Sequence, residues 1–429
     1  MDRKKVMGRG SSIASTTLMF VLASTLGTSA QAQIELTGGL DSRFTDNASK
    51  SSRNEQSDLE SRVYLKADYA SDPGHCNAIF SGTLGYSNWL DGTFDDEAYG
   101  EMDFLGDCEL ADQFYWDVAN TLREVTQSSR SSDTPDNRTR KNVFSTGPRY
   151  NWRINKSNWL TLSTRYENTS FSEGDTSDTE RYLGSAAWNH AFSKTFNGGL
   201  SANYSRTEYD TGAEVDVKTV NLTFSRNWAS MDVSGAIGVS EIDTKAGRSS
   251  QSSDGVVGEL TLLRALTSSS DWYLRAAHQL TDRSSNVDFV FENFQFSLED
   301  SITVETTTVS TGLNNRFSNG ATLNIELYGS QSDYIDDPER EDRGGMNLRY
   351  GRPIAERTTG YLGLGYDYLT YSSDELDERI TRVEVGAEHQ ASRDLSLTAK
   401  VGHQNKVSDA PTSEYDENWV LVGLEYRFR

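Results

Sequence analysis

The histidines and cysteines are the residues of this chain best suited to bind a metal or to act as nucleophiles. The five histidines are dispersed, and none forms the H-E-x-x-H spacing or another paired spacing that holds zinc. A G-x-S-x-G elbow and a phosphate-binding P-loop are also absent. A Ser, a His and an Asp from distant segments could still meet in the fold. Because no motif points to catalysis, we expect no enzyme and no cofactor.

In many segments every second residue is polar or charged and lies opposite an apolar face. Ser, Thr and Asn lie between the charged residues, so this face suits a water-filled lumen. Two interpretations stay open: a wall that contacts a solute, or a wall of mutually neutralising pairs. Tyr115, Tyr328 and Tyr361 share the polar face, and aromatic faces can stack on sugars. The charged candidates for the lumen wall are Arg149, Arg153, Arg165, Arg181, Arg349, Arg382, Glu384, Glu388, Glu425 and Arg427.

The two cysteines, Cys76 and Cys108, lie at the two feet of one predicted hairpin. An oxidising compartment would permit a disulfide there, with Cα atoms about 4.4–6.8 Å apart. Two free thiols are the alternative. A metal site is disfavoured, because His75 is the one additional ligand type beside them.

The final segment, residues 420–429, alternates with a period of two, which places successive side chains on opposite faces of a strand. Its apolar face ends in two aromatic residues, and its other face is charged. This pattern is typical of a strand with lipid on one side and water on the other. A soluble sandwich could also end on such a strand. The apolar face, which we expect the outer-membrane assembly machinery to read as an insertion signal, consists of Val420, Val422, Leu424, Tyr426 and Phe428.

Further alternating segments, such as 59–69 and 196–204, recur along the chain and give about 20 strand candidates. Short turns alternate with long polar loops between them, which predicts an all-β transmembrane antiparallel barrel of about 20 strands (range about 16–20). Both termini would then lie on the periplasmic side. Residues 243–254 are predicted to be one of the long loops. Residues 283–302 are ambiguous, since their phenylalanines fit a tall hairpin, a pore constriction or a surface contact patch.

Residues 1–32 have the features of a secretory signal peptide: a basic head, an apolar stretch and the Ala30-Gln31-Ala32 cleavage site. Residues 33–429 show no linker, so we expect them to form one barrel domain. The net charge is −23, and loss of a leader with four basic residues and one acid leaves −26. Such acidity disfavours nucleic acid as a partner, because nucleic-acid binding needs basic patches.

A family resemblance rests on residues 114–150. The strand Phe114-Tyr115-Trp116-Asp117 is followed by the loop Pro135-Asp136-Asn137-Arg138 and by the strand Val143-Phe144-Ser145-Thr146-Gly147-Pro148. This order resembles the PEP-CTERM-system-associated outer-membrane barrels of the β-barrel porin 2 group. The resemblance implies a cell outer-membrane location and a role in exopolysaccharide export or cell-surface assembly, and it supplies no catalytic residues.

Two classes of function follow from these observations. The first is an export channel, with exopolysaccharide and export proteins as partners. The second is a structural or adhesive barrel with acidic external loops and little conductance. In both cases the outer surface should contact outer-membrane lipid and lipopolysaccharide.

Overall fold

The computed structural model describes residues 33–128, 130–172, 177–282, 284, 303–335, 339–372, 376–410 and 413–428. These residues form 20 strands and one short 3-10 helix. No helix in these ranges is long and apolar enough to cross a membrane. The predicted leader lies outside the described residues, and so does the ambiguous segment 283–302 apart from Ser284.

The strands are numbered in chain order, and η1 (Pro135–Asn137) precedes β6. Strands β1 to β10 span Gln33–Thr45, Asp58–Ala70, Cys76–Trp89, Glu97–Ala111, Phe114–Thr126, Arg138–Arg153, Asn158–Phe171, Thr179–Ala191, Phe196–Tyr209 and Glu214–Asn227. Strands β11 to β20 span Met231–Ala246, Ser249–Thr267, Ser270–Asp282, Thr303–Arg316, Thr322–Tyr334, Arg340–Ala355, Thr358–Tyr371, Leu376–Gln390, Leu395–Ser408 and Tyr415–Arg427.

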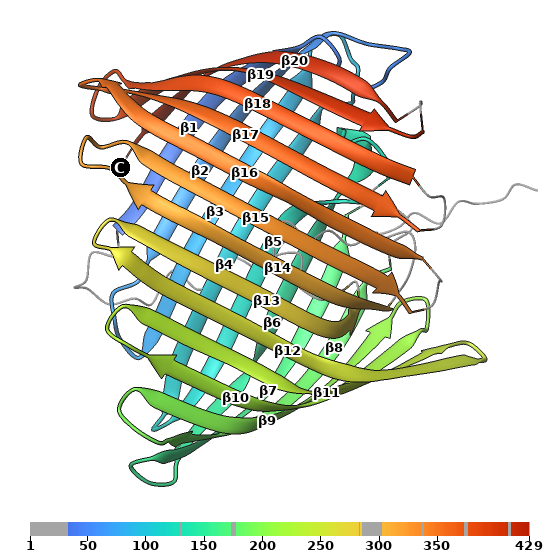
Figure 1. Cartoon of the computed structure of the whole chain (residues 1–429), viewed down its shortest axis with the longest axis vertical. Coiled ribbons are helices and arrows are strands. Elements are labelled where there is room, and N and C mark those ends of the chain that lie inside the picture. Colours follow the sequence, from blue (N-terminus) through green and yellow to red (C-terminus); the bar gives the residue numbers. More distant parts are fainter. Residues whose placement is uncertain are drawn as a thin grey trace, which may run out of the picture.

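Each strand pairs antiparallel with the next along the chain, and the first strand pairs with the last, so the sheet closes into a barrel (Figure 1). At the closure Leu40 faces Leu424 and Gly39 faces Glu425. Closure leaves no unpaired sheet edge, which is the condition for strands to cross a bilayer. The predicted antiparallel barrel of about 20 strands is confirmed.

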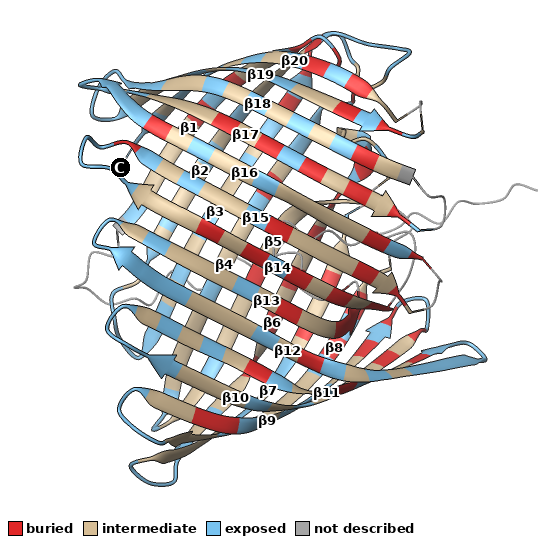
Figure 2. Ribbon diagram, viewed as in Figure 1, coloured by how far each residue is buried: buried red, intermediate tan, exposed pale blue. Residues whose placement is uncertain are grey.

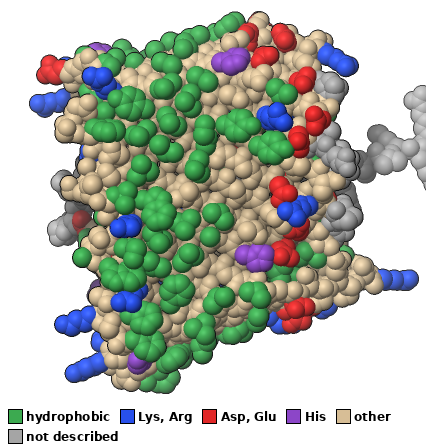
Figure 3. All heavy atoms as spheres, viewed as in Figure 1, with side chains coloured by type: hydrophobic (Ala, Val, Ile, Leu, Met, Phe, Trp, Pro, Cys, Tyr) green, Lys and Arg blue, Asp and Glu red, His purple; other side chains and the backbone are tan. Residues whose placement is uncertain are grey.

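The outer face of the barrel is apolar because alternate residues of each strand project outward. On β20 these are Val420, Val422, Leu424 and Tyr426, with 39–56% of each side chain exposed, and Phe428 follows the strand. Figure 3 shows hydrophobic side chains over the middle of the visible face, with Lys and Arg toward both sides and most Asp and Glu toward the right. This surface matches a hydrocarbon layer between two polar zones.

The two ends of the barrel differ in their connections. One end, here called the turn end, carries both strand termini, Gln33 and Arg427, and short turns such as residues 155–157. The opposite end, here called the loop end, carries the longer connections, including 46–57 and 127–137. The alternation of short and long connections therefore agrees with the sequence. In outer-membrane barrels the short turns lie in the periplasm.

The predicted long loop at residues 243–254 is wrong. Strands β11 and β12 stay paired up to Ala246 and Ser249, and they project past their neighbours as a tall hairpin (Figure 1). Charged and polar residues occupy both faces of this projection, so the apolar alternation disappears from the sequence although the backbone ladder continues. Outside the bilayer, a strand does not need an apolar face.

Candidate functional site in the barrel lumen

The register of the strands places all ten predicted wall residues on the inner side of the barrel. Arg149 donates two hydrogen bonds to Asp117 on the neighbouring strand, at 2.8 and 2.9 Å. Glu425 accepts hydrogen bonds from Tyr64 and Lys66, and Arg427 forms an ion pair with Glu35. Three others, Arg349, Arg382 and Glu384, line one cavity, and Arg165 lines a second one with Arg149. The side chains of Arg153 and Glu388 are exposed near the turn end.

Arg181 has a different environment from the other nine. It is 8% exposed and lies in the loop-end half of the lumen. Its guanidinium contacts Asp282 at 2.5 Å, Glu167 at 3.3 Å and the hydroxyl of Thr207 at 2.9 Å. It also contacts the Ser284 hydroxyl at 2.6 Å. Such a buried cluster is held by the mutual compensation of its charges, so removal of one member leaves the rest unpaired.

Beside this cluster, β13 separates from β12 and carries Leu280 inward. The β12–β13 ladder ends at Gly258 and His278, whereas β13 continues to pair with β14. Leu280 packs with Val215, Ile242 and Val257 in a small apolar core. In Figure 2 most of the buried residues lie in the same half of the barrel, toward the loop end. The loop-end half of the lumen is therefore packed, whereas the inner wall of the other half is more exposed.

Two loops also meet at the loop end. The Lys50 ammonium, from residues 46–57, donates to the backbone carbonyl of Asp133 at 2.7 Å, and the Ser132 hydroxyl donates to the carbonyl of Lys50 at 3.2 Å. The Lys50 ammonium also lies 5.9 Å from the centre of the Tyr415 ring on β20. Both loops are thereby tied to each other and placed near the barrel wall.

Docking affects the two charged groups of this contact differently, because it disfavours the Lys50 ammonium and favours the Asp133 carboxylate. Burial lowers the pKa of the Lys50 ammonium, and Asp133 and Glu417 only partly oppose this effect. Partial desolvation disfavours ionisation of the exposed Asp133 carboxyl, but Arg138 and Lys50 outweigh this effect, so the pKa of the carboxyl lies below its ordinary value. Arg138 donates a hydrogen bond of 2.8 Å to this carboxylate.

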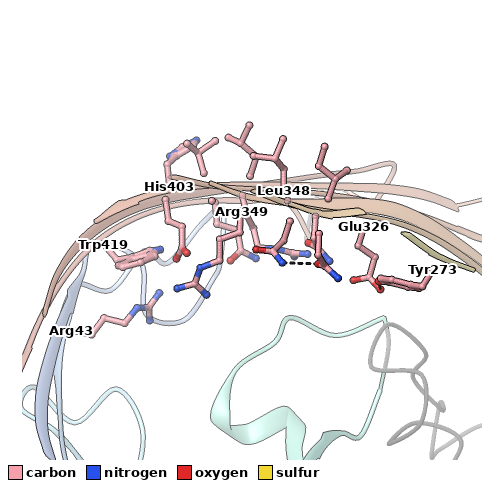
Figure 4. Close-up of a pocket in the computed structure, with 18 residues that line it drawn as sticks. Arg43, Tyr273, Glu326, Leu348, Arg349, His403 and Trp419 are labelled. Atoms are coloured by element: carbon pink, nitrogen blue, oxygen red, sulfur yellow. Dashed lines mark hydrogen bonds between the residues drawn. The ribbon is translucent and has the colours of Figure 1, made fainter. Parts of the chain in front are cut away.

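A cavity of about 570 Å³ lies against the inner wall formed by β13 to β20 and β1. Figure 4 shows Arg43, Trp419, Arg349, Glu326 and Tyr273 on the lumen side of the wall, whereas His403 and Leu348 point to the other side. The loop with a helical turn that faces the wall in this view is the η1 loop. The lining residues of the cavity all belong to barrel strands, and the η1 loop faces this wall from the lumen.

Sequence reasoning missed Arg43, Tyr273 and Trp419 as wall residues. Trp419 points into the lumen, and Arg43 lies 5.3 Å from its ring centre. The parity of β20 places Trp419 on the same face as Glu425. A strict reading of that parity could have found it.

Cys76 and Cys108 are directly paired on β3 and β4 at the turn end and are joined by a disulfide. Their Cα atoms are 4.0 Å apart, which is closer than the expected lower limit of about 4.4 Å. No cysteine in the described ranges is free.

The described residues contain no group of three or more His, Cys, Asp or Glu side chains arranged to hold a metal. His190 bonds Asn158 at 2.9 Å and His278 contacts Glu305 at 3.2 Å, and the strand register places both histidines on the outer side. The cavity wall carries charged, amide and aromatic side chains.

Comparison with known proteins gives one family match. The family described as "Putative beta-barrel porin 2" matches residues 345–428, which comprise most of β16 and all of β17 to β20. No curated protein matches the chain.

Solved structures of similar fold include three barrels. OpdK from Pseudomonas aeruginosa, crystallised with vanillate, is 9% identical, with a TM-score of 0.41 over 92% of this chain and 99% of that one. The ferric enterobactin receptor PfeA of the same organism is 10% identical, with a TM-score of 0.48 over 93% and 81% of the two chains. The FrpB iron transporter from Neisseria meningitidis is 8% identical, with a TM-score of 0.49 over 92% and 81%.

The closed barrel, its apolar outer band and the family match at its last strands agree with one another. Because strands can cross hydrocarbon only in a closed barrel of this kind, the chain is a porin-like β-barrel of the outer membrane.

Proposed function

We propose that this barrel is an outer-membrane channel that serves polysaccharide export and performs no covalent chemistry of its own. The observation that carries the proposal is the cavity along the inner wall, which is lined by charged, amide and aromatic side chains. Barrels of 16–18 strands already enclose an aqueous channel, so a lumen of 20 strands has the width for a hydrated chain.

The resemblance of residues 114–150 to exopolysaccharide-associated barrels supports this class of solute. In the fold, these residues form β5, the η1 loop and most of β6. The η1 loop belongs to the pair of loops that meet through Lys50, so passage of a wide solute requires this pair to separate. We therefore propose a channel with a loop-controlled mouth.

The packed loop end favours a second candidate, a structural or adhesive barrel of little conductance. Lys50 and Arg181 are both largely buried there, and each is held by several contacts. If these contacts persist in the membrane, the lumen stays narrow.

The remaining assignments complete the proposal. Residues 1–32 act as a cleaved signal peptide, and residues 33–429 act as one domain. The assembly machinery recognises β20 through its apolar face, and lipid and lipopolysaccharide contact the outer surface. Export proteins are the expected partners on the periplasmic side.

Two measurements test the proposal. The purified barrel should conduct ions in planar bilayers, and a deletion strain should lose exopolysaccharide secretion, which the wild-type chain restores. Normal secretion in the deletion strain would refute the export role. A barrel that does not conduct, even after residues 48–55 and 128–137 are each replaced by a short Gly-Ser turn, would favour the structural candidate.

A trimmed hairpin provides the matched control for the loop replacements. Removal of residues 245–250 shortens the β11–β12 projection, which lies outside the lumen. Conductance should stay at the wild-type value in this variant.

A further inference from the structure

Six inward-facing aromatic side chains lie against the barrel wall over a glycine of the neighbouring strand. A Cβ on Gly402 would be 2.3 Å from the Trp419 ring, and a Cβ on Gly312 would be 2.5 Å from the Tyr273 ring. Figure 4 shows that both rings lie along the wall and do not project across the lumen. The absence of a side chain on glycine permits this close approach. The six rings are those of Tyr64, Tyr99, Tyr273, Tyr328, Tyr361 and Trp419.

A ring that lies along the wall presents one flat apolar face to the lumen, and its other face packs against the glycine of the neighbouring strand. Trp419 and Tyr273 line the same cavity and are partly exposed. The hydroxyl of Tyr273 is held by Glu326 at 2.9 Å. Fixed rings lose little conformational entropy when a ligand stacks on them, so they are efficient binding platforms.

Between the two rings the cavity wall carries amide side chains. Asn324 donates to Asn314 at 2.7 Å, and Asn347 and Gln404 line the same space. Each amide offers both donors and acceptors, which suits a ligand that carries many hydroxyl groups. The wall therefore combines flat apolar faces with neutral hydrogen-bonding groups.

The charges beside this wall are balanced. Arg43 is bonded to Glu417, and Arg382 is bonded to Asp367. Arg349 lies 5.1 Å from the Tyr361 ring centre, and Glu384 lines the same cavity. With arginines and carboxylates both present, the wall offers no surplus of positive charge to a polyanion. A ligand without net charge fits it better.

We propose that the wall between Tyr273 and Trp419 is a binding site for an uncharged saccharide, whose pyranose rings stack on the two aromatic side chains. The amides between them hydrogen-bond the sugar hydroxyls. This inference rests on the proposed export function and names the substrate class of the lumen, a neutral sugar chain.

Equilibrium binding to the folded, detergent-solubilised full barrel tests the site without requiring an open channel. Titration calorimetry and saturation-transfer NMR with maltohexaose, an oligogalacturonate and a polyethylene glycol of equal length compare the three chemistries. Maltohexaose should bind more tightly than either of the others. Trp419→Ala should weaken its binding about tenfold, as expected for the loss of one stacking contact.

Gly402→Ala provides a second variant that keeps the indole but displaces it from the wall, and it should weaken binding to a similar degree. Trp419→Phe should restore part of the affinity. Gly255→Ala is the control, because its Cβ would meet only Leu280, at 4.0 Å. The folded state of every variant is checked by heat-modifiable migration.

Equal binding of maltohexaose by wild type and Trp419→Ala would overturn the site, and so would tighter binding of the polyethylene glycol or of the oligogalacturonate. A conducting barrel that binds no saccharide would refute this site but leave the channel intact. Saccharide binding by a barrel that never conducts would refute the channel but leave the site intact.

Discussion

Arg165 and Arg181 lie on the inner face of the neighbouring strands β7 and β8, yet they belong to two different halves of the lumen. Arg165 is exposed on the wall of a cavity, whereas Arg181 is buried among two carboxylates and two hydroxyls. Alternation along β7 and β8 assigns both arginines to the same face. The comparison shows that strand parity determines the direction of a side chain and does not determine its environment.

The difference arises at the loop end. There β13 leaves β12, which brings Asp282 and Leu280 inward, and two loops meet at Lys50. Among the described residues the turn end has no equivalent, because its connections are too short to reach far into the lumen. The same barrel therefore combines a closed half stabilised by buried pairs with a more open half whose charges contact water.

The largest effect should come from Arg181→Leu. This change leaves Glu167 and Asp282 buried without their cation, and it should lower the free energy of unfolding by about 3–5 kcal/mol. Urea unfolding of the barrel in micelles measures it. Arg165→Leu, the matched change in the open half, should cost less than about 0.5 kcal/mol. Equal costs for the two variants would show that the two halves do not differ.

The next effect concerns the turn end, where the disulfide is the main covalent restraint. Cys76→Ser with Cys108→Ser opens a link across 32 residues and should lower stability by about 3 kcal/mol. Conductance should not change, because the pair faces away from the lumen. Ser163→Ala with Ser185→Ala removes a 2.6 Å hydroxyl contact between strands and serves as the control. A larger loss for the serine pair would contradict this assignment.

A smaller effect is expected from the outward face of β20. Tyr426 and Phe428 have ring centres 5.2 Å apart, and both side chains face the membrane side. Tyr426→Ala with Phe428→Ala should cost about 2 kcal/mol and reduce the folded fraction. Arg427→Ala breaks an exposed pair with Glu35 and should cost about 0–1 kcal/mol. Equal folded fractions by heat-modifiable migration would argue against β20 as the insertion strand.

The smallest effect should be a pH dependence of the loop contact. The pKa of the Asp133 carboxyl lies below 3.8 when the loops are docked, so the undocked state binds more protons as the pH falls through this range. Docking should therefore weaken below about pH 4. The lowered pKa of Lys50 has the same sign of effect. The docked state binds the Lys50 proton less tightly than the undocked state, so docking becomes more favourable as the pH rises toward 10.5.

Single-channel recordings at pH 3 and pH 7 measure this dependence, and conductance should be higher at pH 3. Asp133→Asn should remove most of the difference. A conductance that rises with pH in the wild type would show that these loops do not control the mouth.

The strand pattern predicted most of the architecture. The alternation in residues 420–428 identified the closing strand and its outward face, and the same parity placed Arg349 and Glu384 on the inner wall. It failed at residues 243–254, because a strand above the membrane has no apolar face to mark it. It also left Trp419 out of the predicted wall, although the parity of β20 places this residue on the inner face.

The sequence by itself determined the two faces of the regular strands, how many strands form and where the short turns lie, because side-chain period and turn length are local properties of the chain. Only the tertiary structure decided which inward residues are buried. Asp282 reaches Arg181 across 101 residues of sequence, and Lys50 reaches Asp133 across 83. Such contacts depend on barrel closure and on how the strand ends bend, and neither leaves a periodic signal in the chain.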